Sequence, residues 1–368
     1  MVSSEILVVG GGVVGLSIAW ELSRRGAEVV VVDRGPKDGG ASWAGGGMLP
    51  PALLDTALHP VERLRGLANR LHPQWARTLQ EITGIDTGFR RCGALHVART
   101  AGEAAALAGA ESLFREAHIA WQRIALDECR EWEPELVADP PLRAVYRAPE
   151  ESQLRNPRHL RALAAACRQS GGRLVQDEVV AVESVEGVPH VVGKRETYSG
   201  RSVCLTLGAW TGPLLEKAGF SNGIYPVRGQ MVLYRGETRL LRHIVIEGTR
   251  YLIPRDDGRL LVGSTEEEVG FDWRTSESAI GDLIAFAQSL VPALRSFPIE
   301  RTWAGLRPAS FDGLPYMGPL PGWRRTFVAA GHFRHGLSLS PAIALVMADL
   351  IEGRRPPIEL EPFALLRA

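Results

Sequence analysis

Arg307, in the last quarter of the sequence, has the side chain and the local context to bind a negatively charged small molecule. Arg307 follows the apolar run Thr302-Trp-Ala-Gly-Leu and precedes Pro308, which places it at the end of a strand. A buried arginine requires an anionic partner, and its planar guanidinium matches the geometry of a carboxylate. The sequence therefore predicts a carboxylate site at Arg307. An internal ion pair with a protein acid is the alternative.

A glycine motif at the start of the chain has the spacing of a dinucleotide site. The apolar run 6–9 is typical of a strand buried on both faces of a parallel sheet. Gly10, Gly12 and Gly15 follow as G-x-G-x-x-G. The first allows the tight turn, the second lets a pyrophosphate approach the backbone, and the third allows close packing of helix on sheet. These glycines predict a phosphate site.

The residues after the glycine motif complete a strand–helix–strand unit. A helix that starts near Val13 and Val14 runs to about Arg25 and stops at Gly26, and its N-terminal N–H groups point at the phosphates. The second strand, 29–32, is followed by Asp33, which can accept a hydrogen bond from a ribose hydroxyl. Because the strand, the helix and the acid all coincide, a unit without ligand is the weaker interpretation.

A second glycine-rich stretch follows, with five glycines between Gly39 and Gly47. Such backbone can lie against a flat ligand because glycine has no Cβ that would clash. A flexible surface loop is the alternative. The large apolar side chains of Trp43 and Met48 argue against it, since linkers seldom carry them.

The glycine motif, the acid after the second strand and the stretch Ser42-Trp-Ala-Gly-Gly-Gly-Met together resemble the D-amino-acid oxidase superfamily of flavoproteins. Within it, the sequence is most similar to the bacterial glycine oxidases associated with thiamine synthesis. The resemblance implies FAD as the dinucleotide. Some relatives attach the flavin to a cysteine in the region that matches 315–319, where this chain has none, so non-covalent FAD is expected.

The resemblance also implies which residues contact FAD, and these are spread over the chain. Val180 is the candidate for a backbone contact with the adenine, and the turn at Gly208 is expected beside the phosphates, although a simple strand-to-helix turn is the alternative. The full expected set is Gly10, Gly12, Val13, Val14, Gly15, Asp33, Arg34, Ser42, Trp43, Ala44, Gly46, Gly47, Met48, Val180, Gly208, Trp210, Arg307, Gly331, His332, Arg334, His335, Gly336 and Leu337.

Three residues are implied at the reaction centre. In the family, the arginine of W-A-G-x-R-P holds the substrate carboxylate, the tyrosine that matches Tyr251 supports it, and Arg334 matches a further arginine of the active site. Met48 and Glu266 are expected at the edge of the substrate pocket. Glu266 is a departure, because related oxidases often carry an apolar residue there. A carboxylate at that place would favour an amine or narrow the site.

The late stretch Thr326-Phe-Val-Ala-Ala-Gly-His-Phe-Arg-His-Gly predicts a strand and a turn, followed by a helix over 337–350. Its N-terminus is expected to face the flavin and to stabilise negative charge there. His332 and His335 also suit a metal ion. No acid or cysteine pattern accompanies them, so no metal site is predicted.

Composition excludes several classes of protein. The chain has 368 residues, 45% of them hydrophobic, and 42 Lys+Arg balance 42 Asp+Glu. No basic excess favours nucleic acid, and no apolar run reaches the length of a membrane span. The first strand begins almost at residue 1, which argues against a signal peptide, and four scattered cysteines indicate reduced thiols. A cytoplasmic protein is expected.

The pattern of elements predicts an α/β, Rossmann-like FAD domain interleaved with an α+β substrate domain that contains a mainly antiparallel sheet. Periodicity predicts helices over 60–84, 101–117, 156–170 and 276–290, helix and loop over 121–136, and strands over 89–98, 174–185, 202–207 and 225–235, with a hairpin turn at Asp257-Gly258. The FAD domain is expected over 1–50, 150–222 and 315–368, and the substrate domain over 51–149 and 223–314.

The predicted reaction is oxidative deamination of glycine, with sarcosine and small D-amino acids as further candidates. Molecular oxygen accepts the electrons, and the imine is expected to serve thiamine thiazole synthesis. One alternative is a dehydrogenase of the same superfamily that passes electrons to a membrane acceptor. Another is a non-catalytic dinucleotide-binding sensor, against which the carboxylate clamp argues. The family also implies a homo-oligomer.

Overall fold

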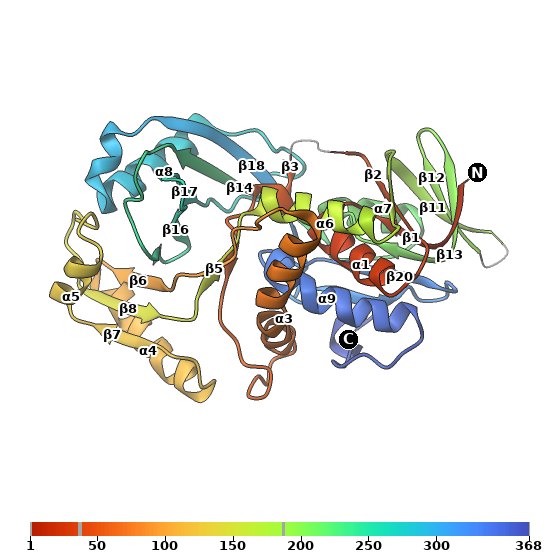
Figure 1. The fold of residues 1–368 in the computed structure, drawn as a ribbon, viewed down its shortest axis with the longest axis horizontal. Helices are drawn as coiled ribbons and strands as arrows, with labels where there is room; N and C mark the ends of the chain where they lie inside the picture. Colours follow the sequence, from red (N-terminus) through yellow and green to blue (C-terminus); the bar gives the residue numbers. More distant parts are fainter. Residues whose placement is uncertain (1, 36–38, 186–187, 368) are drawn as a thin grey trace.

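A computed structural model describes residues 2–35, 39–185 and 188–367. Two large sheets lie in opposite halves of an elongated molecule (Figure 1). Each half has its own set of buried apolar residues. The chain passes between the halves several times, and the predicted fold class is confirmed.

The first sheet is built around β1 (Val2–Val9), the predicted first strand. Its order is β10-β2-β1-β13-β12-β11, and β20 also pairs with β13 and carries β19 on its other side. β1, β2, β10, β13 and β20 are parallel. The bounds are β2 Val29–Asp33, β10 Arg173–Gln176, β11 Val179–Val185, β12 Val188–Gly193, β13 Thr197–Leu205, β19 Tyr316–Pro319 and β20 Thr326–Ala330.

Helices cover this sheet, and α1 (Val13–Arg24) and α9 (Gly336–Ile351) pack together on one face of it. In α1, 11 of 12 residues are buried, and in α9, 11 of 16 are buried, as expected for helices largely enclosed in a core. Further helices of this half include α6 Asn156–Gln169, α7 Thr211–Lys217, and the short η1 Gly208–Trp210 and η3 Glu361–Phe363.

The second sheet is mainly antiparallel, in the order β3-β18-β14-β17-β16-β15-β6-β8-β7. Tyr251 and Ile253 face one core and Leu252 faces another, as the alternating pattern predicts. The bounds are β3 Gly39–Gly40, β6 Ala94–Ala98, β7 Gln122–Ile124, β8 Ala144–Ala148, β14 Tyr225–Tyr234, β15 Ile244–Glu247, β16 Arg250–Pro254, β17 Leu260–Gly263 and β18 Ile299–Ala309.

The remaining elements flank the second sheet or join the two halves. A small third sheet pairs β9 with both β4 and β5. Their bounds, with those of the helices, are β4 Met48–Leu49, β5 Arg90–Arg91, β9 Ser152–Gln153, α2 Ala41–Ala44, α4 Ala101–Glu116, α5 Leu126–Trp132, α8 Glu277–Leu290 and η2 Pro292–Ser296.

Three predicted elements differ from the structure. The strand predicted over 174–185 is two strands, because Asp177 accepts hydrogen bonds from the backbone of Glu178, Arg195 and Glu196 and turns the chain between β10 and β11. The strand over 89–98 breaks near Gly93, which has φ +70°. The helix and loop predicted over 121–136 begins with β7, which pairs with β8.

Helix α3 (Pro60–Thr83) has the predicted amphipathic pattern, but its packing differs from the expected domain division. Leu64, Leu67 and Trp75 join the core beneath the first sheet, and the Trp75 ring meets Trp20 of α1 edge-on at 4.6 Å. Figure 1 shows α3 beside α9. By packing, α3 belongs with the FAD half, although 51–149 was predicted in the substrate domain. A helix's period reveals that a face is buried but does not reveal its partner.

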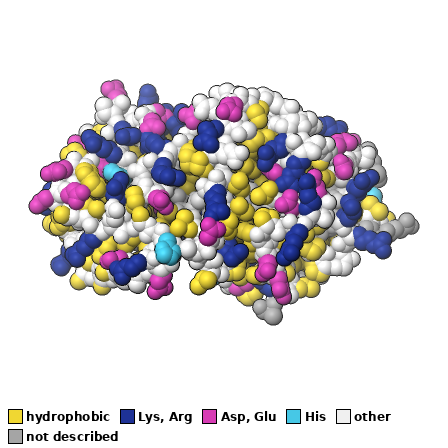
Figure 2. Space-filling view, turned by 60° about the horizontal axis from the view of Figure 1, so that its bottom comes forward, with side chains coloured by type: hydrophobic (Ala, Val, Ile, Leu, Met, Phe, Trp, Pro, Cys, Tyr) yellow, Lys and Arg dark blue, Asp and Glu magenta, His cyan; other side chains and the backbone are white. Residues whose placement is uncertain are grey.

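The surface carries charges of both signs. Figure 2 shows Lys and Arg side chains intermingled with Asp and Glu across the face that it presents, in keeping with the balanced formal charge. Within the described ranges, no helix combines the length and apolar character needed to cross a membrane. All four cysteines are free, and Cys129, Cys167 and Cys204 are buried.

Candidate active site

A cavity of about 1030 Å³ lies between the two halves and receives side chains from both. It is lined by the glycine turn after β1, by α2 and the glycine-rich stretch around it, by α6, and by strands β14, β16 and β18. An amino acid fills only a small part of such a volume. The cavity therefore has the size of a site for a large cofactor together with a small substrate.

Two glycines of the G-x-G-x-x-G motif line this cavity, and the third allows the helix to pack beside it. Gly10 has φ +109°, and a Cβ there would lie 2.5 Å from the Thr206 carbonyl oxygen. A Cβ on Gly15 would overlap the Gly10 carbonyl oxygen, so Gly15 permits α1 to start directly at the turn. Gly10 and Gly12 line the cavity, whereas Gly15 acts through helix packing.

Side chains hold the turn in place. Asp33 accepts hydrogen bonds from the Gly11 N–H and the Gly35 N–H, both at 2.7 Å. The Ser42 hydroxyl accepts from the Val13 N–H at 2.9 Å, at the positive end of the α1 dipole. This end of the cavity is therefore pre-formed for an anionic group such as a pyrophosphate.

Two buried polar atoms point to further ligand contacts. Neither His332 Nε2 nor Asn156 Oδ1 has a hydrogen-bond partner within the described part of the protein, and both residues line the cavity. Buried polar groups are nearly always paired. Together with the phosphate-binding turn, these two atoms fit a cofactor with polar edges, which is the chemistry that FAD offers.

Arg307 extends from β18 into the cavity. Its guanidinium donates to the Ser264 hydroxyl at 2.6 Å, to the Thr265 carbonyl at 3.1 Å and to the Arg228 carbonyl at 3.4 Å. No carboxylate forms an ion pair with it among residues 2–35, 39–185 and 188–367. The internal ion pair considered from the sequence is thus not observed, and the cation remains available to an anionic ligand.

Two glycines make room for the reactive side chains. A Cβ on Gly229 would overlap the Arg307 guanidinium, and one on Gly263 would lie 2.6 Å from the Tyr251 ring and from Met231 Sδ. Tyr251 is buried, and its hydroxyl contacts Met231 Sδ at 3.6 Å. Burial lowers the pKa of Arg307, while the nearby Tyr251 and Glu267 raise it.

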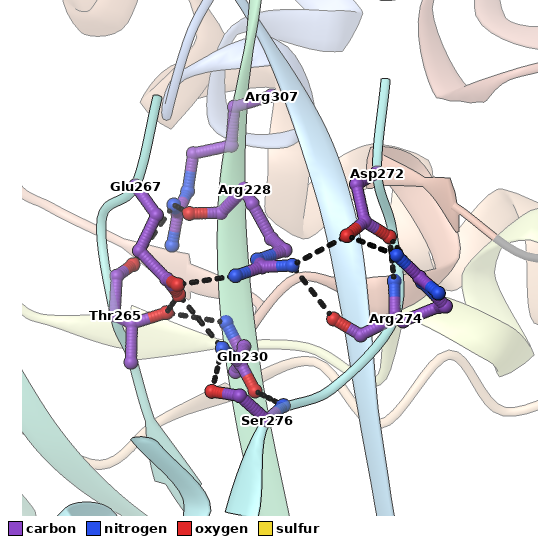
Figure 3. A network of polar contacts seen from close by, with 8 residues as sticks. All are labelled: Arg228, Gln230, Thr265, Glu267, Asp272, Arg274, Ser276 and Arg307. Atoms are coloured by element: carbon purple, nitrogen blue, oxygen red, sulfur yellow. Dashed lines mark hydrogen bonds and ion pairs between the residues drawn. The ribbon is translucent and has the colours of Figure 1, made fainter. Parts of the chain in front are cut away.

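A polar network holds the segment on which Arg307 rests (Figure 3). Glu267 accepts from Arg228 at 2.5 Å, from the Thr265 hydroxyl at 2.5 Å and from the buried Gln230 amide at 2.8 Å. The Thr265 hydroxyl also accepts from the Gln230 N–H at 2.9 Å. Glu267 thus fixes residues 265–267 against β14. This segment adjoins the Ser264 hydroxyl and the Thr265 carbonyl, which accept hydrogen bonds from Arg307.

The same network neutralises a second arginine. Arg228 is 8% exposed and pairs with both Glu267 and Asp272 (Figure 3). Asp272 in turn pairs with the exposed Arg274. Glu267 and Asp272 both pair with Arg228 and form no ion pair with Arg307. The positive charge of Arg307 therefore stays available to a ligand in the cavity.

The turn before α9 contributes Arg334 and two histidines. Arg334 lines the cavity and forms an ion pair with Glu266. Burial, and then the neighbouring His335, lower the pKa of His332 to about 3. Burial, followed by Arg65 and Arg334, lowers the pKa of His335 to about 4. Both rings are neutral at physiological pH. In the described part of the chain, no three His, Cys, Asp or Glu side chains are grouped as metal ligands.

The structure brings most of the predicted site residues to this one cavity. Those that line it are Gly10, Gly12, Val13, Val14, Asp33, Arg34, Ser42, Trp43, Ala44, Gly46, Gly47, Met48, Gly208, Trp210, Tyr251, Arg307, His332, Arg334, Gly336 and Leu337. Five predicted residues are not among the lining residues, namely Gly15, Val180, Glu266, Gly331 and His335. The neighbour of Val180, Val179, does line the cavity.

Sequence reasoning missed several residues of the site. Ser264 and Asn156 line the cavity and bond to Arg307 and to the Ser42 carbonyl respectively. Gln230 is a fully buried amide in the middle of β14, two residues after the buried Arg228. Two polar side chains within a strand of mostly apolar residues were the available signal, because buried polar side chains need partners.

Comparison with known proteins defines the class. Residues 5–350 match the family described as FAD dependent oxidoreductase (DAO), and the chain belongs to this family. FAD is therefore its cofactor, in agreement with the phosphate-binding turn and the size of the cavity.

Individual relatives narrow the class. The chain is 35% identical to a glycine oxidase of Geobacillus kaustophilus over 99% of this chain and 97% of that protein, and 35% identical to a glycine oxidase of Pseudomonas aeruginosa over 98% of each. The crystal structure of glycine oxidase from Geobacillus kaustophilus superimposes with a TM-score of 0.94, at 34% identity and full coverage of both chains. The resemblance stated from the sequence is confirmed.

Proposed function

We propose that the protein oxidises glycine to glyoxylate and ammonia, with oxygen as the final electron acceptor and hydrogen peroxide as the second product. The overall reaction consumes one glycine, one O₂ and one water and releases one glyoxylate, one ammonia and one H₂O₂. Bound FAD supplies the hydride acceptor. The glycine oxidases among its relatives support this substrate.

The observation that carries the proposal is the state of Arg307. Arg307 is a cation that lines the cavity, and its guanidinium donates hydrogen bonds to the Ser264 hydroxyl and the Thr265 carbonyl. No carboxylate among the described residues pairs with it. A substrate carboxylate would complete its hydrogen bonding through the guanidinium fork. Tyr251 lies beside it and closes the same part of the cavity.

The chain's residues would orient the substrate more than they would transfer its protons. The histidines His332 and His335 are held neutral, and we assign no general base. Hydride departure from a carbon that bears a neutral amine requires none. Relatives described as bifunctional protein ThiO/ThiG, 30% identical over 96% of this chain, support use of the imine for the thiazole of thiamine.

Anaerobic mixing with glycine tests the proposal. The flavin absorbance near its visible maximum is expected to bleach with glycine, and admission of oxygen is expected to restore it with release of peroxide. A flavin that no small amino acid bleaches would reject the proposal in favour of a binding module. A flavin that bleaches but is reoxidised by a dye and not by oxygen would indicate a dehydrogenase. A homo-oligomer is part of the proposal, and light scattering measures it.

A further inference from the structure

The ion pair between Arg334 and Glu266 joins a residue that lines the cavity to one that is not among its lining residues. Arg334 lines the cavity, and its side chain is 29% exposed, while that of Glu266 is 46% exposed. Glu266 belongs to the chain that leaves β17, whereas Arg334 belongs to the turn before α9. The pair therefore joins the substrate half to the FAD half at a place that solvent and ligand can reach.

Arg334 and Arg307 are held close together by two independent backbone connections. Arg307 donates to the carbonyl of Thr265, and Glu266 is the next residue. On the other side, the Phe333 N–H donates to the Pro308 carbonyl at 2.6 Å, so the neighbours of the two arginines are bonded to each other. Consecutive Cα atoms are 3.8 Å apart, so Arg307 and Arg334 start from adjoining stretches of backbone, and both line the cavity.

The two arginines differ in one respect. Arg307 has only neutral oxygens as acceptors among the described residues, while Arg334 already has a carboxylate. Two guanidinium groups that line one cavity from adjoining stretches of backbone would suit an amino acid with two carboxylates. The chain itself supplies the second carboxylate.

We propose that Glu266 is a specificity-determining residue that fills a second carboxylate subsite at Arg334, so that the site selects amino acids with one carboxylate. The inference rests on the proposed function for the identity of the substrate. Glu266 acts against dicarboxylates in two ways. It occupies the guanidinium, and when displaced it remains nearby as a like charge. An exposed ion pair is weak, so the exclusion depends on both effects together.

Anion binding to the FAD-loaded enzyme tests the subsite without turnover. Acetate and succinate serve as one- and two-carboxylate probes, and the shift of the flavin visible spectrum reports their dissociation constants. Glu266→Gln is expected to raise the preference for succinate over acetate by about tenfold, equal to about 1.4 kcal/mol. Glu268→Gln, which removes an exposed acid two residues away, is the matched control and is expected to change the preference less than twofold.

A double variant assigns the gain to Arg334. In an Arg334→Met background, Glu266→Gln is expected to change the succinate preference less than threefold, because the subsite is gone. A preference that Glu266→Gln leaves unchanged would overturn the proposal. A tenfold gain that persists without Arg334 would also overturn it, since general repulsion would then account for the effect.

Turnover provides a second arm. The ratio of kcat/KM for iminodiacetate to that for glycine is expected to rise about tenfold in Glu266→Gln, and an unchanged ratio counts against the proposal. If glycine does not reduce the flavin of the parent enzyme, the proposed function fails, while the acetate and succinate measurements still decide the role of Glu266.

Discussion

At the scale of single residues, the site depends on where charge is left uncompensated. Arg228 and Arg307 belong to the paired strands β14 and β18, where Arg307 lies opposite Val227, the residue before Arg228 (Figure 3). Arg228 forms ion pairs with two carboxylates, while Arg307 donates hydrogen bonds to one hydroxyl and two carbonyl oxygens. A buried guanidinium without a counter-charge is costly. Binding of an anion would offset that cost. The same uncompensated charge that makes Arg307 costly for folding therefore makes it suited to bind a substrate carboxylate.

Arg307→Ala is expected to reduce the efficiency of flavin reduction by glycine roughly 30- to 4,000-fold. Truncation of one partner of a buried charge pair costs on the order of 2–5 kcal/mol, at about 1.4 kcal/mol per factor of ten. Arg307→Lys is expected to recover only part, because an ammonium lacks the planar fork. Stopped-flow reduction measures both variants. A folded, yellow Arg307→Ala enzyme within threefold of the parent would transfer the role to Arg334.

The rate of flavin reduction by glycine is expected to rise from pH 6 to pH 10, as the substrate ammonium loses its proton. The pKa of His332 is lowered to about 3 and that of His335 to about 4, so neither ring titrates in this range. Burial raises the pKa of Glu151 to about 8, but Glu151 does not line the cavity. The control Glu151→Gln should therefore keep the same pH profile. A flat profile in the parent enzyme would mean that a protein base accepts the proton.

At the scale of elements, the site is assembled by the contact between β14 and the chain that follows β17. Arg228 and Glu267 exchange backbone hydrogen bonds as well as an ion pair. Gly229, between Arg228 and Gln230, leaves the space for the Arg307 guanidinium. Alternate residues of one strand thus carry the network, and the glycine between them admits the side chain from β18. The position of Arg307 is a property of three strand segments together.

Glu267→Gln is expected to raise the KM for glycine roughly 3- to 30-fold with a smaller change in kcat. The amide keeps the shape but removes the charge that holds Arg228 and Thr265, so the oxygens that receive Arg307 lose their fixed place. This change corresponds to about 0.7–2 kcal/mol, which is below the cost of breaking a fully buried pair, because Glu267 is 25% exposed. Steady-state kinetics measures it.

Asp272→Asn is the matched control for this prediction. Asp272 also pairs with Arg228, at 3.4 Å, but bonds to neither Thr265 nor Gln230 in the described network (Figure 3). Its KM should stay within about twofold of the parent, since a partly exposed pair contributes little. Equal KM changes in both variants would show that the total charge around Arg228, and not the placement of Thr265, controls Arg307.

At the scale of the whole molecule, the two halves meet across the cofactor cavity. Residues from both sheets line it, and Arg255 from the β16 end donates buried hydrogen bonds to the Gly46 carbonyl at 2.7 Å and the Leu154 carbonyl at 3.1 Å. Burial lowers the pKa of Arg255 to about 9. A ligand in this cavity contacts both halves and is expected to stabilise them together.

Acid or heat is expected to release the FAD into the supernatant, because residues 315–319 contain no cysteine. The apoprotein is expected to melt at a lower temperature than the holoenzyme, since a ligand at 100 times its Kd stabilises the folded state by about 2.7 kcal/mol. Differential scanning fluorimetry with and without added FAD measures the shift. Yellow colour retained in the precipitate would reveal a covalent link.

Stability is expected to fall as pH decreases from about 6.5 to about 4. Burial lowers the pKa of His159 to about 3 and that of His72 to about 4, from an ordinary 6.5. In that window the unfolded chain binds protons that the folded chain does not, so acid favours unfolding. Urea unfolding at pH 7 and pH 5 measures the loss. In His159→Gln, the free energy of unfolding should fall less between pH 7 and pH 5, by on the order of 1–2 kcal/mol. An equal fall in parent and variant would show that His159 does not contribute to the pH dependence.

The sequence alone was enough for several features that depend on neighbours along the chain. The glycine motif, the buried run of β2, Asp33 and the hairpin at Asp257-Gly258 are local patterns with one physical solution each. The family resemblance of these motifs identified FAD as the cofactor. The carboxylate clamp at Arg307 stays a prediction, which the lack of an ion-pair partner among the described residues supports.

Only the tertiary structure decided which distant residues share a contact. The sequence predicted Glu266 at the pocket edge, but Glu266 is not among the lining residues, and its ion pair with Arg334, 68 residues away, was not predictable. The sequence also did not predict that Ser264 and Thr265 accept hydrogen bonds from Arg307, or that Gly229 leaves space for its guanidinium. Nor did it predict that α3 packs on the FAD half. Periodicity shows that a face is buried and composition shows that a charge exists. The partner is chosen by the packing of the whole chain, which no local pattern encodes.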